Sequence, residues 1–231
     1  MGVTLASYNV HGCVGTDGRH DVPRIARVLK ALRAEVIALQ EVIFHPTDAG
    51  QPEPVDILAE LSGFHAICAP IARVGNDHFG NALLTTLPVL RVETLDLHVG
   101  SYEPRTALDV DLDVRGKRLR VIATHLGLRP AERRYQVKRL LAHVAHDEDA
   151  TTVLLGDFNE WFLMGRPLRW LHERFGRSAS HATYPSFLPL LALDRVWVHP
   201  KPMLAHVHCH TEGEARVASD HLPLVATLKP L

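Results

Sequence analysis

The sequence is poor in cysteine and has no excess of either charge. Its three cysteines, Cys13, Cys68 and Cys209, are odd in number and far apart, so they indicate neither a disulfide framework nor a zinc site. A reducing, cytoplasmic location is the default expectation for such a chain. The formal net charge is −1 at pH 7, which gives no long-range attraction for a polyanion. Nucleic acid is therefore a partner that the charge does not favour, and nothing in the sequence indicates a protein partner.

Long apolar runs are also missing. No stretch approaches the length that spans a bilayer, so no transmembrane segment is expected. The N-terminus, MGVTLASYNV, lacks the basic region and the apolar segment of a secretory signal. No linker rich in proline, glycine or serine interrupts the 231 residues. We therefore predict a single domain, residues 1–231, with a substantial core.

What the sequence does contain is a series of short apolar runs suited to buried strands. They lie at residues 4–8, 36–39, 82–86, 119–124, 152–155, 193–198 and 222–228. Helical spacing of apolar residues is clearest over residues 22–33, where Asp21 precedes as a cap, and over residues 130–144. Weaker helices are predicted at residues 55–61 and 167–175. Consecutive strands between about residues 80 and 125 favour mixed sheets covered by helices over a purely parallel sheet.

Polar side chains begin or end most of these runs. Those that follow a run are Asn9, Glu41, His125 and Asp157, and those that precede one are Asp194, Asp220 and His221. Each alone has a structural explanation, such as a turn, a cap or a hydrogen-bonded core histidine. If the last two strands run antiparallel to their neighbours, however, all of these groups meet on one rim. Polar groups gathered there are costly to bury without a partner or a metal, so the set as a whole indicates a functional site.

Seven short motifs strengthen this interpretation. In chain order they are SYNVHG, LQEV, GNALLTTLPV, THLGLRP, GDFNE, LDRVWV and SDHLPL, spread over residues 7–224. With them the sequence resembles the endonuclease/exonuclease/phosphatase superfamily, and within it the small bacterial metal-dependent hydrolases. The resemblance implies an α/β (α+β) fold of the DNase-I-like type, a four-layer sandwich of two packed mixed β-sheets flanked by helices. It also implies a hydrolase that acts on phosphoric ester bonds.

The resemblance assigns the metal ligands. Glu41 corresponds to the principal ligand, Asn9 offers an amide oxygen beside it, and Asp220 assists. These hard oxygen donors suit Mg²⁺, with Mn²⁺ as the alternative.

The resemblance also assigns the catalytic groups. Asp157 orients or deprotonates the attacking water, and Asn159 contacts that water or the phosphate. Asp194 holds His221 in one orientation, and His221 is either the general base or a protonated phosphate clamp. His125 donates a hydrogen bond to the phosphate or a proton to the leaving group.

Two further residues are predicted to bind the substrate phosphate. Arg105, in PRTALDV, stands where relatives carry a phosphate-binding arginine, and its planar fork matches phosphate. An arginine that enters a strand is also common on surfaces. Asn81, in GNALLT, supports the site by hydrogen bonding or takes a turn role.

Three other segments bear on specificity. The basic segment 129–139, RPAERRYQVKR, is better explained as a solvated helix face than as a nucleic-acid patch. Core packing is the favoured explanation for most of the large apolar residues after GDFNE, with base stacking or docking to lipid as the alternative; they are Trp161, Phe162, Met164, Trp170 and Phe175. The loop at residues 44–54 follows Glu41 and is expected to form a substrate wall.

The sequence thus predicts a Mg²⁺-dependent phosphoesterase, with a phosphodiester of a small or lipid-linked substrate favoured. A repair-type DNA endonuclease or exonuclease is the alternative, and a non-catalytic phosphate-binding module is the third hypothesis. The substrate itself is not encoded in any motif, because specificity in such folds is carried by variable loops.

Overall fold

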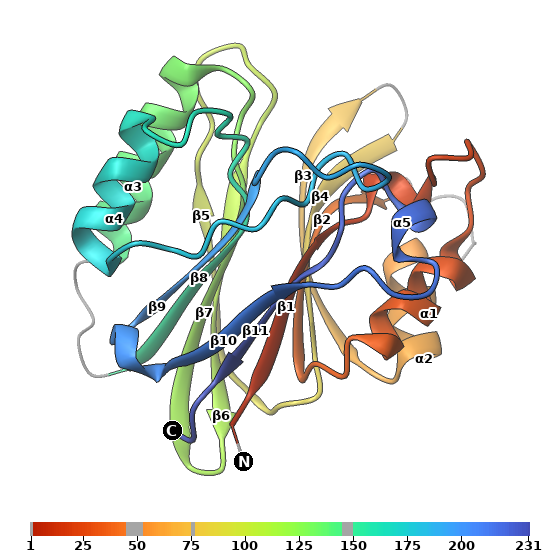
Figure 1. Ribbon diagram of the computed structural model, residues 1–231, viewed down its shortest axis with the longest axis horizontal. Coiled ribbons are helices and arrows are strands. Elements are labelled where there is room, and N and C mark those ends of the chain that lie inside the picture. Colours follow the sequence, from red (N-terminus) through yellow and green to blue (C-terminus); the bar gives the residue numbers. More distant parts are fainter. Residues whose placement is uncertain (1, 45–52, 75–76, 145–149) are drawn as a thin grey trace.

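Two mixed β-sheets packed face to face form the centre of the molecule (Figure 1). The computed structural model describes residues 2–44, 53–74, 77–144 and 150–231. Within these residues the first sheet has the order β10-β11-β1-β2-β4-β3. Its strands are β10 (Leu204–Cys209), β11 (Leu224–Leu228), β1 (Thr4–Asn9), β2 (Val36–Phe44), β4 (Asp77–Thr85) and β3 (His65–Val74). Strands β1 and β2 are parallel, and β11 is antiparallel to β1.

The second sheet has the order β5-β6-β7-β8-β9 in the described part of the chain. Its strands are β5 (Val89–Asp96), β6 (Thr106–Val114), β7 (Lys117–His125), β8 (Thr151–Asp157) and β9 (Asp194–His199). Strands β7 and β8 are parallel, whereas β9 is antiparallel to β8. Both sheets are therefore mixed, as the sequence predicted.

Helices cover the outer face of each sheet (Figure 1). The first sheet is covered by α1 (Val22–Ala31), α2 (Pro54–Ser62) and the short α5 (Ala215–Ala218), and the second by α3 (Pro130–Val144) and α4 (Arg166–Phe175). Two short 3-10 helices, η1 (His11–Cys13) and η3 (Lys201–Met203), lie in connections. The α1 helix begins as predicted, because Asp21 Oδ1 accepts a hydrogen bond from the Arg24 backbone N–H at 2.8 Å.

Three apolar cores separate the four layers. The central core lies between the sheets and contains Leu5, Val36, Leu108 and Val153, all fully buried. A second core joins α1 and α2 to the first sheet, and a third joins α3 and α4 to the second sheet. Strands such as β1 and β8 are thus buried on both faces, which explains their nearly continuous apolar sequences. This arrangement confirms the four-layer sandwich.

Some boundaries differ from the predicted ones in ways that affect the site. Glu41 lies inside β2 and not after it, because the ladder to β4 shifts register between Leu39 and Val42. Asp157 is the last residue of β8 and not a turn residue. Strand β5 was not resolved from the sequence, because this edge strand is largely exposed and shows no buried apolar run. Most of the predicted substrate wall, residues 45–52, lies outside the described residues.

None of the described helices is long and apolar enough to cross a membrane.

Candidate active site

The predicted polar residues converge on one rim of the sandwich, where ends of parallel strands meet starts of antiparallel ones. His125 ends β7, Asp157 ends β8 and Asp194 begins β9. The register pairs His125 with Asp157 and Asp157 with Asp194, so these three residues form a row across neighbouring strands. Asn9 ends β1 in the facing sheet. The antiparallel direction of β9 and β11 is the condition that the sequence analysis required for convergence.

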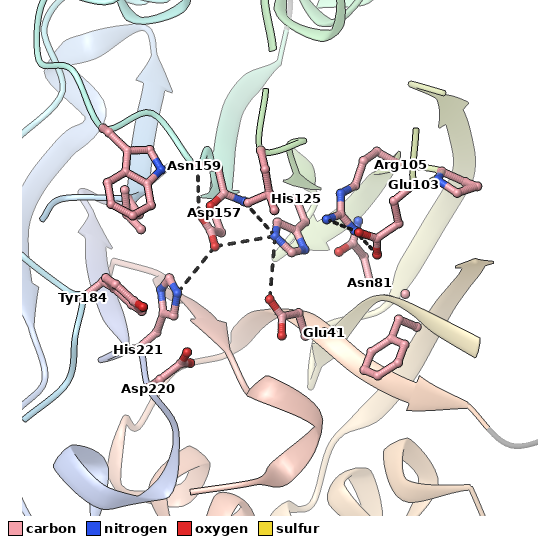
Figure 2. Close-up of a pocket in the computed structure, with 16 residues that line it drawn as sticks. Glu41, Asn81, Glu103, Arg105, His125, Asp157, Asn159, Tyr184, Asp220 and His221 are labelled. Carbon is pink, nitrogen blue, oxygen red and sulfur yellow. Dashed lines mark hydrogen bonds and ion pairs between the residues drawn. The ribbon is translucent and has the colours of Figure 1, made fainter. Parts of the chain in front are cut away.

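A cavity of about 420 Å³ opens at this rim (Figure 2). Of the ten residues predicted for the site, eight line it: Glu41, Asn81, Arg105, His125, Asp157, Asn159, Asp220 and His221. The other two, Asn9 and Asp194, lie behind the wall and hydrogen-bond to residues that line it. The structure therefore brings all ten residues together.

Asp157 lies at the centre of the site and is only 1% exposed. Its carboxylate accepts hydrogen bonds from Asn9 Nδ2 at 3.2 Å and from the Asn159 backbone N–H at 2.9 Å. The Nε2 atoms of His125 and His221 lie 3.6 and 3.7 Å from Asp157 Oδ2. Burial raises the pKa of Asp157 to about 6, with the His221 imidazolium opposing the rise and Asp194 adding to it. A carboxylate tuned toward neutral pH is suited to accept a proton.

Asn159 acts through its side chain on His125. Asn159 Nδ2 donates to the Leu126 carbonyl at 2.9 Å and lies 3.0 Å from His125 Nε2. The backbone of Asn159 has a positive φ of 49°, which is uncommon for a residue with a side chain and is found at functional sites. The amide group thus holds the imidazole in one orientation, a contact that the sequence did not indicate.

His221 is held by Asp194, as predicted. His221 Nδ1 lies 2.8 Å from Asp194 Oδ2, and both residues are buried. Burial works to lower the pKa of His221, but the carboxylates of Asp194 and Asp157 outweigh it and raise the pKa to about 10. The ring of Tyr184 packs against the imidazole at 4.9 Å between centroids. A protonated His221 with Nδ1 occupied presents Nε2–H to the pocket, which fits a phosphate clamp better than a general base.

The pKa of His125 is shifted in the opposite direction to that of His221. Burial, together with the positive charges of Arg105 and His221, lowers its pKa well below 6.5. The ring is therefore neutral at neutral pH. The two histidines of the pocket differ because a buried carboxylate is hydrogen-bonded to one and an amide to the other.

Glu41 and Asn9 form the adjoining wall. Glu41 has a φ of 54°, inside the irregular part of β2, so its carboxylate is aimed into the pocket at a cost in backbone strain. Asn9 Nδ2 donates to Glu41 Oε1 at 2.9 Å, and Asn9 Oδ1 accepts from the His11 backbone N–H at 3.1 Å. Figure 2 shows Glu41, Asp157 and Asp220 directed toward the same space.

The charges of this wall fit a divalent cation. In the described residues, none of Glu41, Asp157 and Asp220 forms an ion pair with an arginine or lysine. Three carboxylates in one partly desolvated pocket repel one another unless a cation neutralises them. Oxygen donors that leave most of the coordination shell to water and substrate are typical of Mg²⁺. The residues present therefore suit the metal that the sequence implied.

A second acidic group lies elsewhere and is already neutralised. Glu93, Asp109 and His143 bring their oxygen and nitrogen atoms within 4.8 Å of one another on the second sheet and α3. Asp109 is bonded there to Arg120 at 2.6 Å and to Arg91 at 3.1 Å. These arginines supply the positive charge that a metal would supply, so we interpret this group as an ion-pair network.

Arg105 lies on the opposite side of the pocket from Tyr184 and His221 (Figure 2). It is 8% exposed, and its two terminal nitrogens donate to Glu103 at 2.8 and 2.9 Å. A phosphate that engages the fork of Arg105 must therefore compete with Glu103, which is much more exposed. Asn81 Nδ2 donates to the Thr106 carbonyl at 3.0 Å and fixes the strand start next to Arg105. Asn81 lies within β4, so the turn role considered for it is wrong.

Comparison with known proteins identifies the family of the chain. The sequence model of the Endonuclease/Exonuclease/phosphatase family matches residues 6–221. The chain belongs to this family. Enzymes of the family are usually hydrolases of phosphoester bonds, and they generally use a divalent metal.

Similar proteins of this family cover the whole chain. The uncharacterized protein YbhP of Escherichia coli K12 is 30% identical over 241 residues, which cover 97% of this chain and 95% of that protein. A family structure from Beutenbergia cavernae superposes with a TM-score of 0.81 at 23% identity, over 99% of this chain and 71% of that one. A structure of D. rerio TDP2 complexed with a single-strand DNA product superposes with a TM-score of 0.73 at 18% identity, over 99% of both chains. At these identities the two structures show the shared fold alone.

Several residues that line the active-site pocket were not predicted from the sequence. Glu103, Leu128 and Tyr184 line the cavity, but Leu128 and Tyr184 belong to irregular connections without periodicity. The acidic Glu103 two residues before Arg105 was the one readable signal, since it offers a partner for the guanidinium.

Two predictions about the flanking segments need correction. Arg133, in the basic segment expected to be a solvated helix face, is 1% exposed and pairs with the buried Glu160 at 3.2 Å. The apolar residues after GDFNE are not mainly core: Trp161, Phe162 and Met164 are 50%, 68% and 77% exposed. The reason is that residues 158–165 leave the sheet at the rim, where the core packing of α4 has not yet begun.

Proposed function

We propose that this protein is a Mg²⁺-dependent phosphoesterase that hydrolyses a phosphodiester of a small or lipid-linked substrate, with Mn²⁺ as the alternative metal. The observation that carries the proposal is the division of charge in the pocket. Glu41, Asp157 and Asp220 direct carboxylates into the pocket, and positive charge comes from Arg105 on one side and from the protonated His221, 3.7 Å from Asp157, on the other. A cation among the carboxylates and a phosphate among the basic groups would satisfy both.

The chain's own residues would each take one part of the reaction. Asp157, with a pKa near 6, orients a water and accepts its proton. His221 donates a hydrogen bond from Nε2 to a phosphate oxygen, because Asp194 occupies Nδ1. Asn159 Nδ2 donates to His125 Nε2 and keeps the ring oriented, and the neutral His125 adds no charge to the pocket. Preorganised donors such as His221 Nε2 stabilise the developing negative charge.

Glu41 and Asp220 would hold the metal, and Asn9, predicted as a ligand, would instead orient Glu41 and Asp157 through its Nδ2. Bound there, Mg²⁺ neutralises phosphate charge and favours attack by water. Arg105 would donate hydrogen bonds to a phosphate oxygen once its ion pair with Glu103 is broken.

Exposed apolar side chains next to the pocket support a lipid-linked substrate. Leu128 and Trp161 line the cavity, and Phe162, Leu163 and Met164 continue from Trp161; we call these five residues the apolar rim. All five are at least half exposed. An apolar surface around a polar pocket suits a substrate with a polar head and an apolar tail.

A metal-dependent screen tests the proposal. Purified protein would be assayed with and without Mg²⁺ against a soluble phosphodiester, a phosphomonoester, phospholipid vesicles and single-stranded DNA. Hydrolysis of the diester should be lost with EDTA and restored by Mg²⁺. Asp157→Asn and Glu41→Gln should each reduce turnover by roughly 10²- to 10⁴-fold, whereas the exposed Glu60→Gln on α2 should have no effect. Full activity in either pocket variant, with a normal circular dichroism spectrum, would refute the mechanism.

A second set of variants tests the substrate class. Phe162→Ser should lower activity on phospholipid vesicles and leave activity on the soluble diester unchanged, because the side chain is 68% exposed and does not line the pocket. Equal activity of wild type and variant on vesicles would count against the lipid-linked substrate.

Nuclease activity is the second candidate, and Trp161 is the observation that favours it. Its half-exposed ring at the pocket edge could stack on a base. The net charge of −1 weighs against a duplex. Cleavage of DNA in the screen, together with binding that weakens as salt rises, would establish this alternative.

The cytoplasmic location is also part of the proposal. Cys13, Cys68 and Cys209 are all free thiols in the structure, which supports a reducing compartment.

A further inference from the structure

A second cavity lies beside α4, the helix that with α3 covers the outer face of the second sheet (Figure 1). Its volume is about 540 Å³, and it shares no lining residue with the active-site pocket. Its polar walls come from α4, from the segment that follows it and from β9; they include Arg169, His172, Arg177, Ser178 and Arg195. We call this cavity the α4 pocket.

Arg195 is the central observation. Neighbouring residues of a strand point to opposite faces, so Asp194 faces His221 in the active site and Arg195 faces α4. Arg195 is 2% exposed, and its Nε donates to the Ala192 carbonyl at 3.1 Å. Its Nη2 is buried and has no hydrogen-bond partner in the described part of the chain, and no carboxylate there forms an ion pair with it. Burial lowers the pKa of Arg195 although the charges of Asp194 and Glu160 oppose this, and a buried guanidinium that no carboxylate contacts directly is costly.

Two other residues of the α4 pocket also have a buried polar atom that lacks a hydrogen-bond partner in the described part of the chain. His172 Nε2 and Ser178 Oγ are buried without a hydrogen-bond partner among the described residues, and both residues line the same cavity. The active-site pocket, by comparison, is lined by one residue with such an atom, Arg105. Buried polar groups in folded proteins nearly always find partners. Three of them around one cavity indicate a ligand with several acceptor atoms.

The net charge of the cavity restricts the chemical class of the ligand. Arg169 and Arg177 lie exposed at its mouth, and Glu173 is the one carboxylate of the wall. With Arg195, these residues leave two net positive charges. Burial, together with the charges of Arg195 and Arg177, lowers the pKa of His172, so this imidazole is a neutral hydrogen-bond donor or acceptor. A doubly charged group with several oxygens matches both the charge and the donors.

We propose that the α4 pocket binds a phosphate group, which is held by Arg195, hydrogen-bonded by Ser178 and His172, and attracted by Arg169 and Arg177. Leu163 and Met164 give the cavity an apolar side, so the phosphate comes either free from solution or on an organic molecule with an apolar substituent. This site goes beyond the proposed function and does not depend on it.

Calorimetric titration of the whole chain with inorganic phosphate in EDTA tests the proposal, because EDTA removes metal-assisted binding in the active site. Arg195→Met should weaken phosphate binding at least tenfold, whereas Arg105→Gln, in the active-site pocket, should leave this binding unchanged. Equal affinity in wild type and Arg195→Met would overturn the proposal. Loss of binding in Arg105→Gln alone would also overturn it, since the phosphate would then occupy the active site.

Surface variants keep the test valid if Arg195→Met does not fold. The double variant Arg169→Gln with Arg177→Gln removes two exposed charges at the mouth and should weaken binding several-fold. Arg166→Gln, an exposed arginine of the same helix outside the cavity, is the matched control and should bind like wild type. The same affinity in the double variant and the control would contradict the site. Absence of wild-type binding up to about 10 mM, where even a millimolar site is mostly occupied, would mean that the cavity holds water only.

Phenyl phosphate and acetate separate the possible sources. Tighter binding of phenyl phosphate than of inorganic phosphate, lost in Met164→Ser, would identify an organic phosphate. Equal binding of the two would identify free phosphate. Acetate that binds as tightly as phosphate would refute the choice of ligand class.

Discussion

The replacement of Asp194 by asparagine tests how the active site controls the charge of His221. Asp194 is fully buried, and its Oδ2 lies 2.8 Å from His221 Nδ1. With the carboxylate removed, burial would lower the pKa of His221 against the remaining charges of Asp157 and Asp220. We expect the pKa to fall from about 10 to 6.5 or below. His221 would then be neutral at pH 7, and the phosphate clamp would lose its charge.

The magnitude follows from the structure. A rise from 6.5 to about 10 corresponds to roughly 5 kcal/mol in favour of the protonated form, at about 1.4 kcal/mol for each pH unit. Because the folded pKa lies above the unfolded one, this stabilisation is complete below pH 6.5 and is lost as the pH rises toward 10. Between pH 6.5 and pH 10, deprotonation of His221 should therefore lower the free energy of unfolding of the wild-type protein by up to about 5 kcal/mol. Asp194→Asn should not show this additional fall.

Two measurements on metal-free protein check this prediction. Urea denaturation of wild type and variant at several values between pH 6 and pH 10 gives the difference in slope, and cysteine, tyrosine and lysine titrations cancel in the comparison. An NMR titration of the imidazole gives the pKa of His221 directly. Glu60→Gln serves as the control and should follow wild type. An unchanged titration of His221 in Asp194→Asn would refute the reasoning, since Asp157 and Asp220 would then account for the raised pKa.

Four further variants test the scaffold. Glu160→Gln should lower the free energy of unfolding by about 3–5 kcal/mol in urea denaturation, because it leaves the buried Arg133 unpaired; a cost below about 1 kcal/mol would show that the pair is solvated. Gly156→Ala should lower the free energy of unfolding by at least about 3 kcal/mol, since φ is 146° and a Cβ would lie 1.8 Å from the Thr124 carbonyl oxygen. Gly63→Ala, at φ 80° in open space, should lower it by about 1–2 kcal/mol. Equal costs for the two glycines would contradict this account. Burial opposes ionisation of Asp109, but Arg120 and His143 outweigh it and lower the pKa, so Asp109 contributes stability above its unfolded pKa that is lost as the pH falls through the folded one. The acid limb of a pH–stability curve should flatten in Asp109→Asn, and an unchanged limb would contradict the pairing.

Much of the scaffold could be predicted from local pattern. Residues 130–144 were predicted as a helix and form α3 with those bounds, because proline in the first turn and apolar residues at helical spacing act over a few neighbouring positions. The edge strand β5 escaped prediction, since a strand exposed on both sides has no apolar run to detect, whereas the buried edge strand β9 was predicted at residues 193–198.

The membership of the site could also be predicted, but its internal contacts could not. His125, Asp157 and Asp194 were identified as polar residues at strand ends, and the register places them in one row. Asn159 hydrogen-bonds to His125, and Glu103 forms an ion pair with Arg105. These contacts depend on side-chain positions, which the spacing of residues in the sequence does not reveal.

By itself, then, the sequence predicted mixed sheets and the set of polar residues, because apolar periodicity and strand ends are local properties of the chain, and its ordered motifs carried the resemblance that implied the layered sandwich and the class of chemistry. Only the tertiary structure decided which histidine is charged, where the backbone is strained and which arginine lacks a partner. His221 and His125 are both buried, and their pKa values move in opposite directions because different residues, distant in sequence, surround them. Arg195 lies in the LDRVWV motif, but nothing in the sequence singles it out; its importance follows from being buried under α4 with no ion-pair partner among the described residues.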